Sequence, residues 1–371
     1  MWIYLAYIFI TLIAYYAFIG GSKPYIHNSG IVVQRKRIYF SWVAGILLWV
    51  IFAFRDVSVG SDTINYFERY SNIQKPEVSL LSIAGQEWGY DLLQYLCHSI
   101  GMSWQVYLSF ISVIIIIPMV IFFHKYSTNV WSSFFLYITI GLLDVNMSAL
   151  RQSLAVAMVV WALMAMFERK YLRSLLFILI GTLFHYSAFF ALLLFLVPLF
   201  KYKSKRQLTL LLLVPILARV VGYFFLGSLE NLMPVRYLDS YSEEKTMNPL
   251  LEAVWISILL FIFFSLRING KVKSDEFQLY FLVVLYVSSI ELSYSVYLAS
   301  RLAYYFEPAV MVAMPMAMMK FRNKETRAII SVVIHSLCFA FLIISSYGSD
   351  TLAIYNYHFF WQGFTKYSSI F

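Results

Sequence analysis

The strongest constraint in this sequence is a succession of apolar blocks, many of them long enough to cross a membrane, separated by short polar links. The first block covers residues 2–19 and contains no charged residue. Across the chain, 61% of residues are hydrophobic and 13% are charged, a balance that excludes an ordinary soluble domain. Because a helix needs ~20 apolar residues to span the hydrocarbon core, we predict an all-α, polytopic membrane bundle of about twelve membrane segments. It is predicted to form a single transmembrane domain over residues 1–371.

The basic residues predict the orientation of these segments. The formal net charge is +9, but Lys and Arg concentrate in short links such as residues 35–37 and 320–327. This pattern is typical of cytoplasmic links and does not indicate a nucleic-acid partner. Acidic residues concentrate in two longer polar segments, residues 55–101 and 230–249. We predict that these are the first and second outer loops, that the first contains interfacial helices, and that both termini lie outside.

The block of residues 174–200 needs a special arrangement, because both of its flanking clusters are basic and should be cytoplasmic. The block is too short to cross the membrane twice at about 20 residues per crossing. We therefore predict a hairpin of two short helices that turns near His185, Tyr186 and Ser187. Irregular backbone at this depth must be lined by protein or water, so His185 is predicted at the floor of a cavity open to the outside.

Four arginines lie at or near the predicted outer ends of apolar blocks: Arg55, Arg151, Arg219 and Arg301. A planar guanidinium can bind phosphate oxygens with two N–H groups, so converging arginines favour an anionic ligand. His185 and Arg151 are the most informative candidates, because ionisable residues in apolar segments usually face a wet cavity or a partner. Interfacial anchoring of the arginines and a packing role for His185 are the alternative interpretations.

The segment FRDVSVGSDTINYFERY, at the start of the first outer loop, adds further candidates. Gly60 permits a tight backbone turn. Asp62 either caps the helix that follows or supplies a carboxylate near the cavity mouth, as a base or as a ligand of sugar hydroxyls. The sequence contains two cysteines, no cluster with metal-ligand spacing and no nucleotide-binding loop, so we expect neither a metal nor a cofactor.

Four motifs, taken in order, resemble those of a known family. The segments FRDVSVGSDTINYF, ALRQSLAVAM, FHYSA and RLAYYF are similar to the EpsG family of Wzy-like polysaccharide polymerases, over about residues 1–328. The resemblance implies an enzyme that polymerises oligosaccharide units carried on undecaprenyl diphosphate, at the outer face of the bacterial inner membrane. The product would be O-antigen, capsule or exopolysaccharide. The implied partners are the lipid-linked oligosaccharide, membrane lipids, a chain-length regulator and a flippase.

The implied chemistry suggests a role for each candidate. The growing glycan would leave its lipid diphosphate as a hydroxyl at the non-reducing end of a new unit attacks the anomeric carbon. We predict catalytic roles for His185, Asp62 and Arg151, with His185 or Asp62 as the base and arginines stabilising the diphosphate without a metal. The predicted substrate-binding residues are Arg55, Asp56, Gly60, Tyr66, Gln152, Arg301 and Tyr304.

Two other functions remain open at this point. A flippase or transporter of lipid-linked sugars would use the same arginines for binding, but transporters usually have repeated halves, which this sequence does not show. A polyprenyl-phosphate-dependent glycosyltransferase or ligase would share the cavity and differ in its acceptor. The products formed from a lipid-diphosphate oligosaccharide would distinguish the three.

Overall fold

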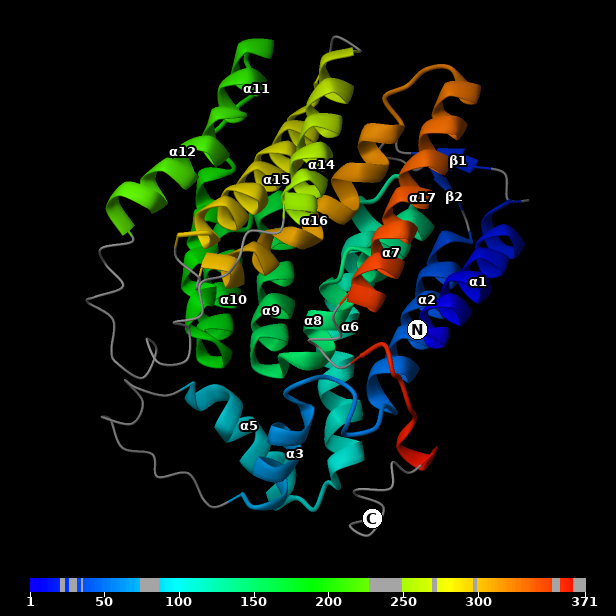
Figure 1. The fold of residues 1–371 in the computed structure, drawn as a ribbon, viewed down its shortest axis with the longest axis vertical. Helices are drawn as coiled ribbons and strands as arrows, with labels where there is room; N and C mark the ends of the chain where they lie inside the picture. The colour runs from blue at the N-terminus through cyan, green and yellow to red at the C-terminus, as the bar shows by residue number, and fades with distance from the viewer. Residues whose placement is uncertain are drawn as a thin grey trace. The chain divides into compact units, whose positions relative to one another are not determined.

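Helices form nearly all of the regular structure (Figure 1). The computed structural model describes residues 1–20, 24–26, 32–34, 36–73, 87–226, 249–268, 272–295, 299–348 and 354–362. Within these ranges one strand pair occurs, the short antiparallel pairing of β1 (Pro24–Ile26) with β2 (Val32–Gln34). The prediction of an all-α, polytopic membrane protein is confirmed.

Six helical segments in the described part of the chain are long and apolar enough to cross a membrane. They are Trp2–Gly20, Trp104–Tyr126, Leu150–Phe167, Lys205–Phe224, Ser274–Ser293 and Lys324–Ser346. A seventh exists if α7 (Val130–Thr139) and α8 (Leu142–Ser148), bent by 58°, count as one span. Gly141 makes this bend possible, because its φ of +98° is a conformation that glycine adopts at little cost.

Several shorter or less apolar helices complete the set. Three apolar helices have 10–17 residues: α2 (Arg37–Ala53), α10 (Tyr171–Phe184) and the 3₁₀ helix η2 (Tyr186–Leu196). Two longer helices, α14 (Pro249–Ile268) and α16 (Ser300–Met318), have 20 and 19 residues. The number of crossings, about twelve from the sequence, stays a prediction.

The chain divides into two compact units. Unit 1 contains residues Met1–Met164, Leu172–Phe189 and Val333–Phe371, and unit 2 contains residues Ala165–Tyr171 and Phe190–Val332. The single transmembrane domain over residues 1–371 stays a prediction.

The centre of unit 1 is the packing of α2 along α6 (Trp104–Tyr126), with α1 (Trp2–Tyr15) beside α2 (Figure 1). The helices approach so closely that a Cβ on Gly45 would lie 2.5 Å from Cγ2 of Val120, so glycine is needed there. Pro118 lies inside α6. Neighbouring helices can satisfy the backbone groups that such a proline leaves free.

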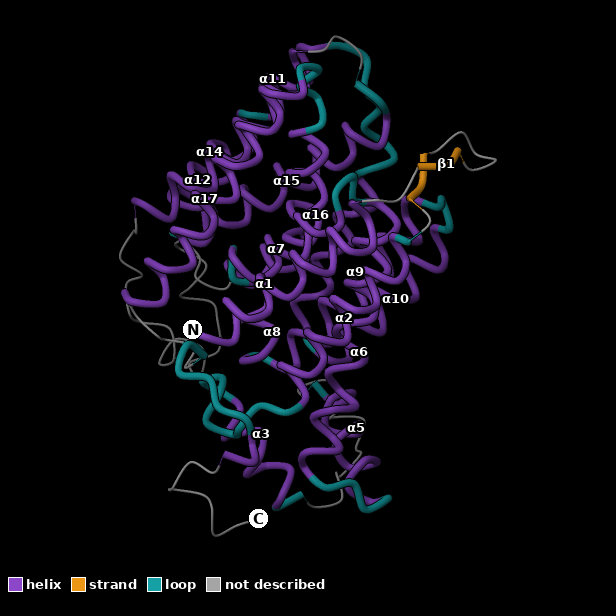
Figure 2. The backbone as a smooth tube through the Cα atoms, turned by 90° about the vertical axis from the view of Figure 1, so that its right-hand side faces the viewer, coloured by secondary structure: helices purple, strands orange, loops and turns teal. Residues whose placement is uncertain are grey.

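Two short helices, α3 (Thr63–Ser71) and α5 (Trp88–Ser99), lie together at one end of α6 (Figures 1 and 2). An ion pair joins them, with Arg69 Nη2 2.7 Å from Asp91 Oδ1. The ring of Tyr70 on α3 stacks on that of Tyr107 on α6, with centroids 4.5 Å apart. We call this region the α3–α5 end of unit 1. Its location at a membrane interface stays a prediction.

The tail of residues 354–362 packs against the end of α2. The backbone N–H of Asp56 donates to the carbonyl of His358 at 2.9 Å, and that of Phe360 donates to the carbonyl of Phe54 at 3.0 Å. The tail therefore packs on the same loop that carries the first sequence motif.

Unit 2 is built from α12 (Leu213–Val221), α14, α15 (Ser274–Ser293) and α16. Arg219 on α12 forms ion pairs with Glu252 on α14 and Glu291 on α15, the second at 2.9 Å between Nη1 and Oε2. Its guanidinium thus joins three helices of this unit, a structural role beyond the interfacial anchoring considered from the sequence. The predicted second outer loop, residues 230–249, lies outside the described residues apart from Pro249.

Candidate functional site

His185 lies at the turn predicted for residues 174–200. Its backbone N–H donates to the carbonyl of Gly181 at 3.0 Å and closes α10, while its own carbonyl accepts from Ala188 at 3.0 Å and starts η2. A Cβ on Gly181 would lie 3.4 Å from Cβ of Ala188. In a continuous α-helix, two residues seven positions apart, such as Gly181 and Ala188, would lie about 10 Å from each other. The chain therefore folds back at His185, and the predicted position of the turn is confirmed.

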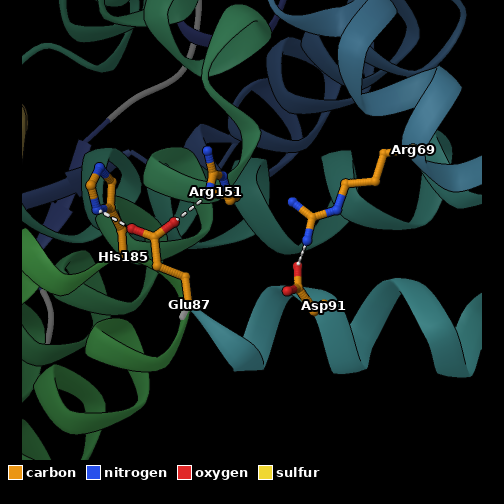
Figure 3. Close-up of polar contacts among 5 residues, drawn as sticks. All are labelled: Arg69, Glu87, Asp91, Arg151 and His185. Atoms are coloured by element: carbon orange, nitrogen blue, oxygen red, sulfur yellow. Dashed lines mark hydrogen bonds and ion pairs between the residues drawn. The ribbon is translucent and has the colours of Figure 1, made fainter. Parts of the chain in front are cut away.

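Glu87, immediately before α5, brings the two principal candidates together (Figure 3). Its Oε1 lies 2.7 Å from Nδ1 of His185, and its Oε2 accepts a hydrogen bond from Nη1 of Arg151 at 2.7 Å. The side chains of His185 and Glu87 are 11% and 13% exposed, whereas that of Arg151 is 41% exposed. One shielded carboxylate thus joins a buried imidazole to a more accessible guanidinium.

A close approach of two backbones explains how Glu87 reaches His185. A Cβ on Gly89 would lie 2.7 Å from Cβ and 2.8 Å from the carbonyl oxygen of Leu183, two residues before His185. Only glycine allows the first turn of α5 to lie this close to the end of α10. The segment EWG therefore positions the carboxylate through packing, although its residues lie far from His185 in the sequence.

Arg151 is the second residue of α9 (Leu150–Phe167), and it also contacts Tyr66 of α3. Burial raises the pKa of Tyr66, and the charge of Arg151 opposes that rise. Burial also acts to raise the pKa of Glu87, but the neighbouring His185 and Arg151 more than offset this effect and hold the pKa below its usual value. The carboxylate of Glu87 is therefore held in its ionised form.

Two residues of the first motif, Arg55 and Asp56, are buried and hydrogen-bonded within the protein. Arg55 is completely buried, and its guanidinium donates to the backbone carbonyls of Phe52 at 2.6 Å, Met147 at 2.7 Å and Val59 at 3.2 Å. Asp56 is also buried, and its Oδ1 accepts hydrogen bonds from the backbone N–H and the hydroxyl of Ser58. The roles of Arg55 and Asp56 in binding substrate stay predictions.

Gly60 allows a tight turn in the same loop. Its φ is +96°, and a Cβ there would lie 2.6 Å from Oγ1 of Thr63 and 3.0 Å from the carbonyl oxygen of Met147. Both the backbone conformation and the lack of space require glycine. Gly60 therefore lets the loop pack against α8, and its predicted contact with substrate stays a prediction.

Asp62 and Gln152 are sequence neighbours of the contacts described above, before α3 and after Arg151. Asp62 is exposed at the N-cap of α3 and makes no side-chain capping hydrogen bond, so the capping interpretation is not observed. Its charge contributes to raising the pKa of Tyr66, which places the carboxylate near that phenol. Gln152 follows Arg151 on α9 and is buried. The catalytic role of Asp62 and the binding roles of Tyr66 and Gln152 stay predictions.

Arg301 and Tyr304 belong to unit 2, where both lie in the first two turns of α16 and are half-buried. Their roles in binding substrate stay predictions.

Glu87 is not among the predicted site residues, because in the sequence it is one of several acidic residues of the first outer loop. The available signal was local: an acidic residue at the start of an amphipathic segment, two residues before a glycine. No spacing rule connects it with Arg151 or His185. Within the described ranges, no group of three His, Cys, Asp or Glu side chains could hold a metal ion.

The fold and this cluster define an integral membrane protein whose helices bring a histidine, a carboxylate and an arginine together at the α3–α5 end of unit 1. A model of the EpsG family matches residues 37–367, and the chain belongs to this family of Wzy-like polysaccharide polymerases. The match continues through the aromatic tail, beyond the region of residues 1–328 covered by the motifs. No curated protein and no solved structure matches the chain.

Proposed function

We propose that this protein polymerises oligosaccharide repeat units carried on undecaprenyl diphosphate, at the outer face of the bacterial inner membrane. Membership of the EpsG family implies a polysaccharide polymerase-like role in a bacterial membrane. The lipid carrier, the face of the membrane and the residue roles are our proposal. One observation carries it: Glu87 lies 2.7 Å from both Nδ1 of His185 and Nη1 of Arg151.

The proposed reaction is a glycosyl transfer. The hydroxyl at the non-reducing end of the acceptor unit forms a C–O bond with the anomeric carbon of the growing glycan. The bond between this carbon and the diphosphate oxygen breaks, and its electron pair stays on the diphosphate. The proton of the attacking hydroxyl passes to His185, whose imidazole can act as a general base.

Arg151 is suited to bind the diphosphate leaving group. Its guanidinium is accessible, with 41% of the side chain exposed, and it is already oriented by an oxygen anion of Glu87. The same N–H geometry binds phosphate oxygens, and a cation at the departing diphosphate stabilises the charge that develops there. The mechanism uses no metal ion. Arg301 and Tyr304 are proposed to bind the lipid-linked substrates.

Asp62 is the second candidate for the base. It is exposed at the start of α3 and lies near Tyr66, which contacts Arg151. His185 is preferred because it is shielded, lies at a turn and has a carboxylate partner, whereas Asp62 has no side-chain capping contact that fixes it. A chain-length regulator and a flippase are proposed as protein partners, because polymer length must be limited and the lipid-linked units must reach the outer face.

Reconstitution of the purified protein tests this function. The full chain is placed in lipid nanodiscs with lipid-linked oligosaccharide extracted from a strain that lacks the protein. We expect a ladder of glycans that differ by one repeat unit. Addition of a single unit would indicate a ligase or other glycosyltransferase. Translocation in sealed vesicles without any product would indicate a flippase, and either result would contradict the proposal.

A further inference from the structure

We propose that Glu87 is a positioning residue for the transfer reaction: it orients the imidazole of His185 and holds Arg151 beside it. This inference rests on the proposed function and deepens it. It concerns a residue that the motif resemblance does not include, because Glu87 lies outside all four motifs.

The geometry determines which ring nitrogen would act as the base. The carboxylate of Glu87 lies 2.7 Å from Nδ1 of His185, and an ionised carboxylate can only accept hydrogen bonds. We therefore assign a hydrogen to Nδ1. In neutral imidazole this places the lone pair on Nε2, so Nε2 is the atom that would receive the proton of the acceptor hydroxyl.

Glu87 also compensates the charge that the reaction creates. When His185 accepts a proton, an imidazolium forms beside the carboxylate. Both side chains are largely shielded, at 11% and 13% exposed, so their attraction is stronger than in bulk water. The groups that face Glu87 are His185, the guanidinium of Arg151 and the backbone N–H of Tyr186. All of them stabilise the ionised carboxylate.

The same carboxylate competes with substrate for Arg151. Its Oε2 accepts a hydrogen bond from Nη1 of Arg151, so an arriving diphosphate must share this guanidinium with Glu87. Loss of the Glu87 charge would leave more of the Arg151 positive charge for the diphosphate. Substrate binding should then be unchanged or tighter, while the chemical step becomes slower.

The test compares Glu87→Gln with Asp91→Asn in nanodiscs, with the extracted lipid-linked oligosaccharide as probe. Asp91 is a matched control, because it lies in the first turn of the helix that Glu87 precedes and forms an ion pair of the same 2.7 Å length with Arg69 (Figure 3). We expect kcat of Glu87→Gln to fall on the order of 10²-fold, as for a reacting group displaced by about 1 Å. KM should not rise, and Asp91→Asn should resemble the wild type.

A double-mutant cycle shows whether Glu87 acts through His185. In a His185→Gln background, Glu87→Gln should cause little further loss of kcat, because the group that it orients is already absent. A full additional loss would overturn the proposal. Wild-type kcat in Glu87→Gln, or a raised KM with unchanged kcat, would overturn it as well.

A second variant covers the case in which Glu87→Gln does not accumulate in membranes. Glu87→Asp keeps the charge but withdraws the carboxylate by one methylene, so kcat should again fall while KM is retained. Wild-type kcat in this variant would contradict the positioning role. Failure of the wild-type protein to form polymer would instead contradict the proposed function, and with it the transfer reaction in which Glu87 is given this role.

Discussion

Gly89 and Leu183 approach so closely that a Cβ on the glycine would lie 2.7 Å from Cβ of the leucine. This contact joins the first turn of α5 to the end of α10. It places Glu87 and His185, which are distant in the sequence, within 2.7 Å of each other. The geometry of the candidate site therefore depends on a packing contact outside it.

The first prediction concerns this contact. Gly89→Ala should push α5 away from α10, because the new methyl group cannot fit beside the backbone of Leu183. Overpacking of this kind costs about 1–3 kcal/mol, and the shift of Glu87 should reduce polymer formation about 10-fold or more. Ser99→Ala, at an exposed position of the same helix, is the control. Unchanged polymer synthesis in Gly89→Ala, at normal protein levels, would show that the contact does not position the site.

The second prediction concerns the arginines. Arg151→Lys and Arg301→Lys each keep a positive charge but lose the planar pair of N–H groups that matches a diphosphate. We expect polymer synthesis to fall strongly in both, on the order of 10-fold or more, because one or two charge-assisted hydrogen bonds are lost. Arg69→Lys, on the α3–α5 ion pair, is a suitable control because its side chain is 48% exposed and pairs with Asp91. Normal polymer from both test variants would exclude bidentate binding by these residues.

The third prediction is the pH dependence of stability. The pKa of Glu87 is lowered in the folded protein, so its ionised form contributes stability that is present above the ordinary carboxyl pKa. This contribution is lost as the pH falls through the lowered value. Thermal unfolding in detergent should show the wild type more stable than Glu87→Gln at pH 6, with a difference that shrinks as the pH approaches 3. A difference that grows over this range would contradict the assigned ionisation.

The turn at His185 was predictable because it follows from two simple constraints: basic clusters on both sides of an apolar block, and too few residues for two full crossings. The prominence of Arg151 was predictable for a similar reason, since charged residues are costly in apolar segments. Both signals are local or depend only on residue counts. They required no knowledge of which helices are neighbours.

The sequence alone could not show that Arg55 is buried or that Glu87 lies in the candidate site. An arginine at the end of an apolar helix has the same sequence signature whether it faces a ligand or, as Arg55 does, donates to three buried backbone carbonyls. Acidic residues are common in polar loops, so the sequence does not distinguish Glu87 from the others. Its position becomes clear only from the contact between Gly89 and Leu183. In both cases the missing information was the packing of segments distant in the sequence.

The most direct test of the central claim is the rate of glycan transfer by His185→Gln, measured with purified protein and lipid-linked oligosaccharide at matched protein levels. Glutamine keeps hydrogen bonding and approximate volume beside Glu87 but cannot accept a proton from the attacking hydroxyl. We predict a loss on the order of 10²-fold or more, because that is what general-base catalysis contributes. A rate close to that of the wild type would contradict the assignment of His185 as the base and leave Asp62 as the candidate.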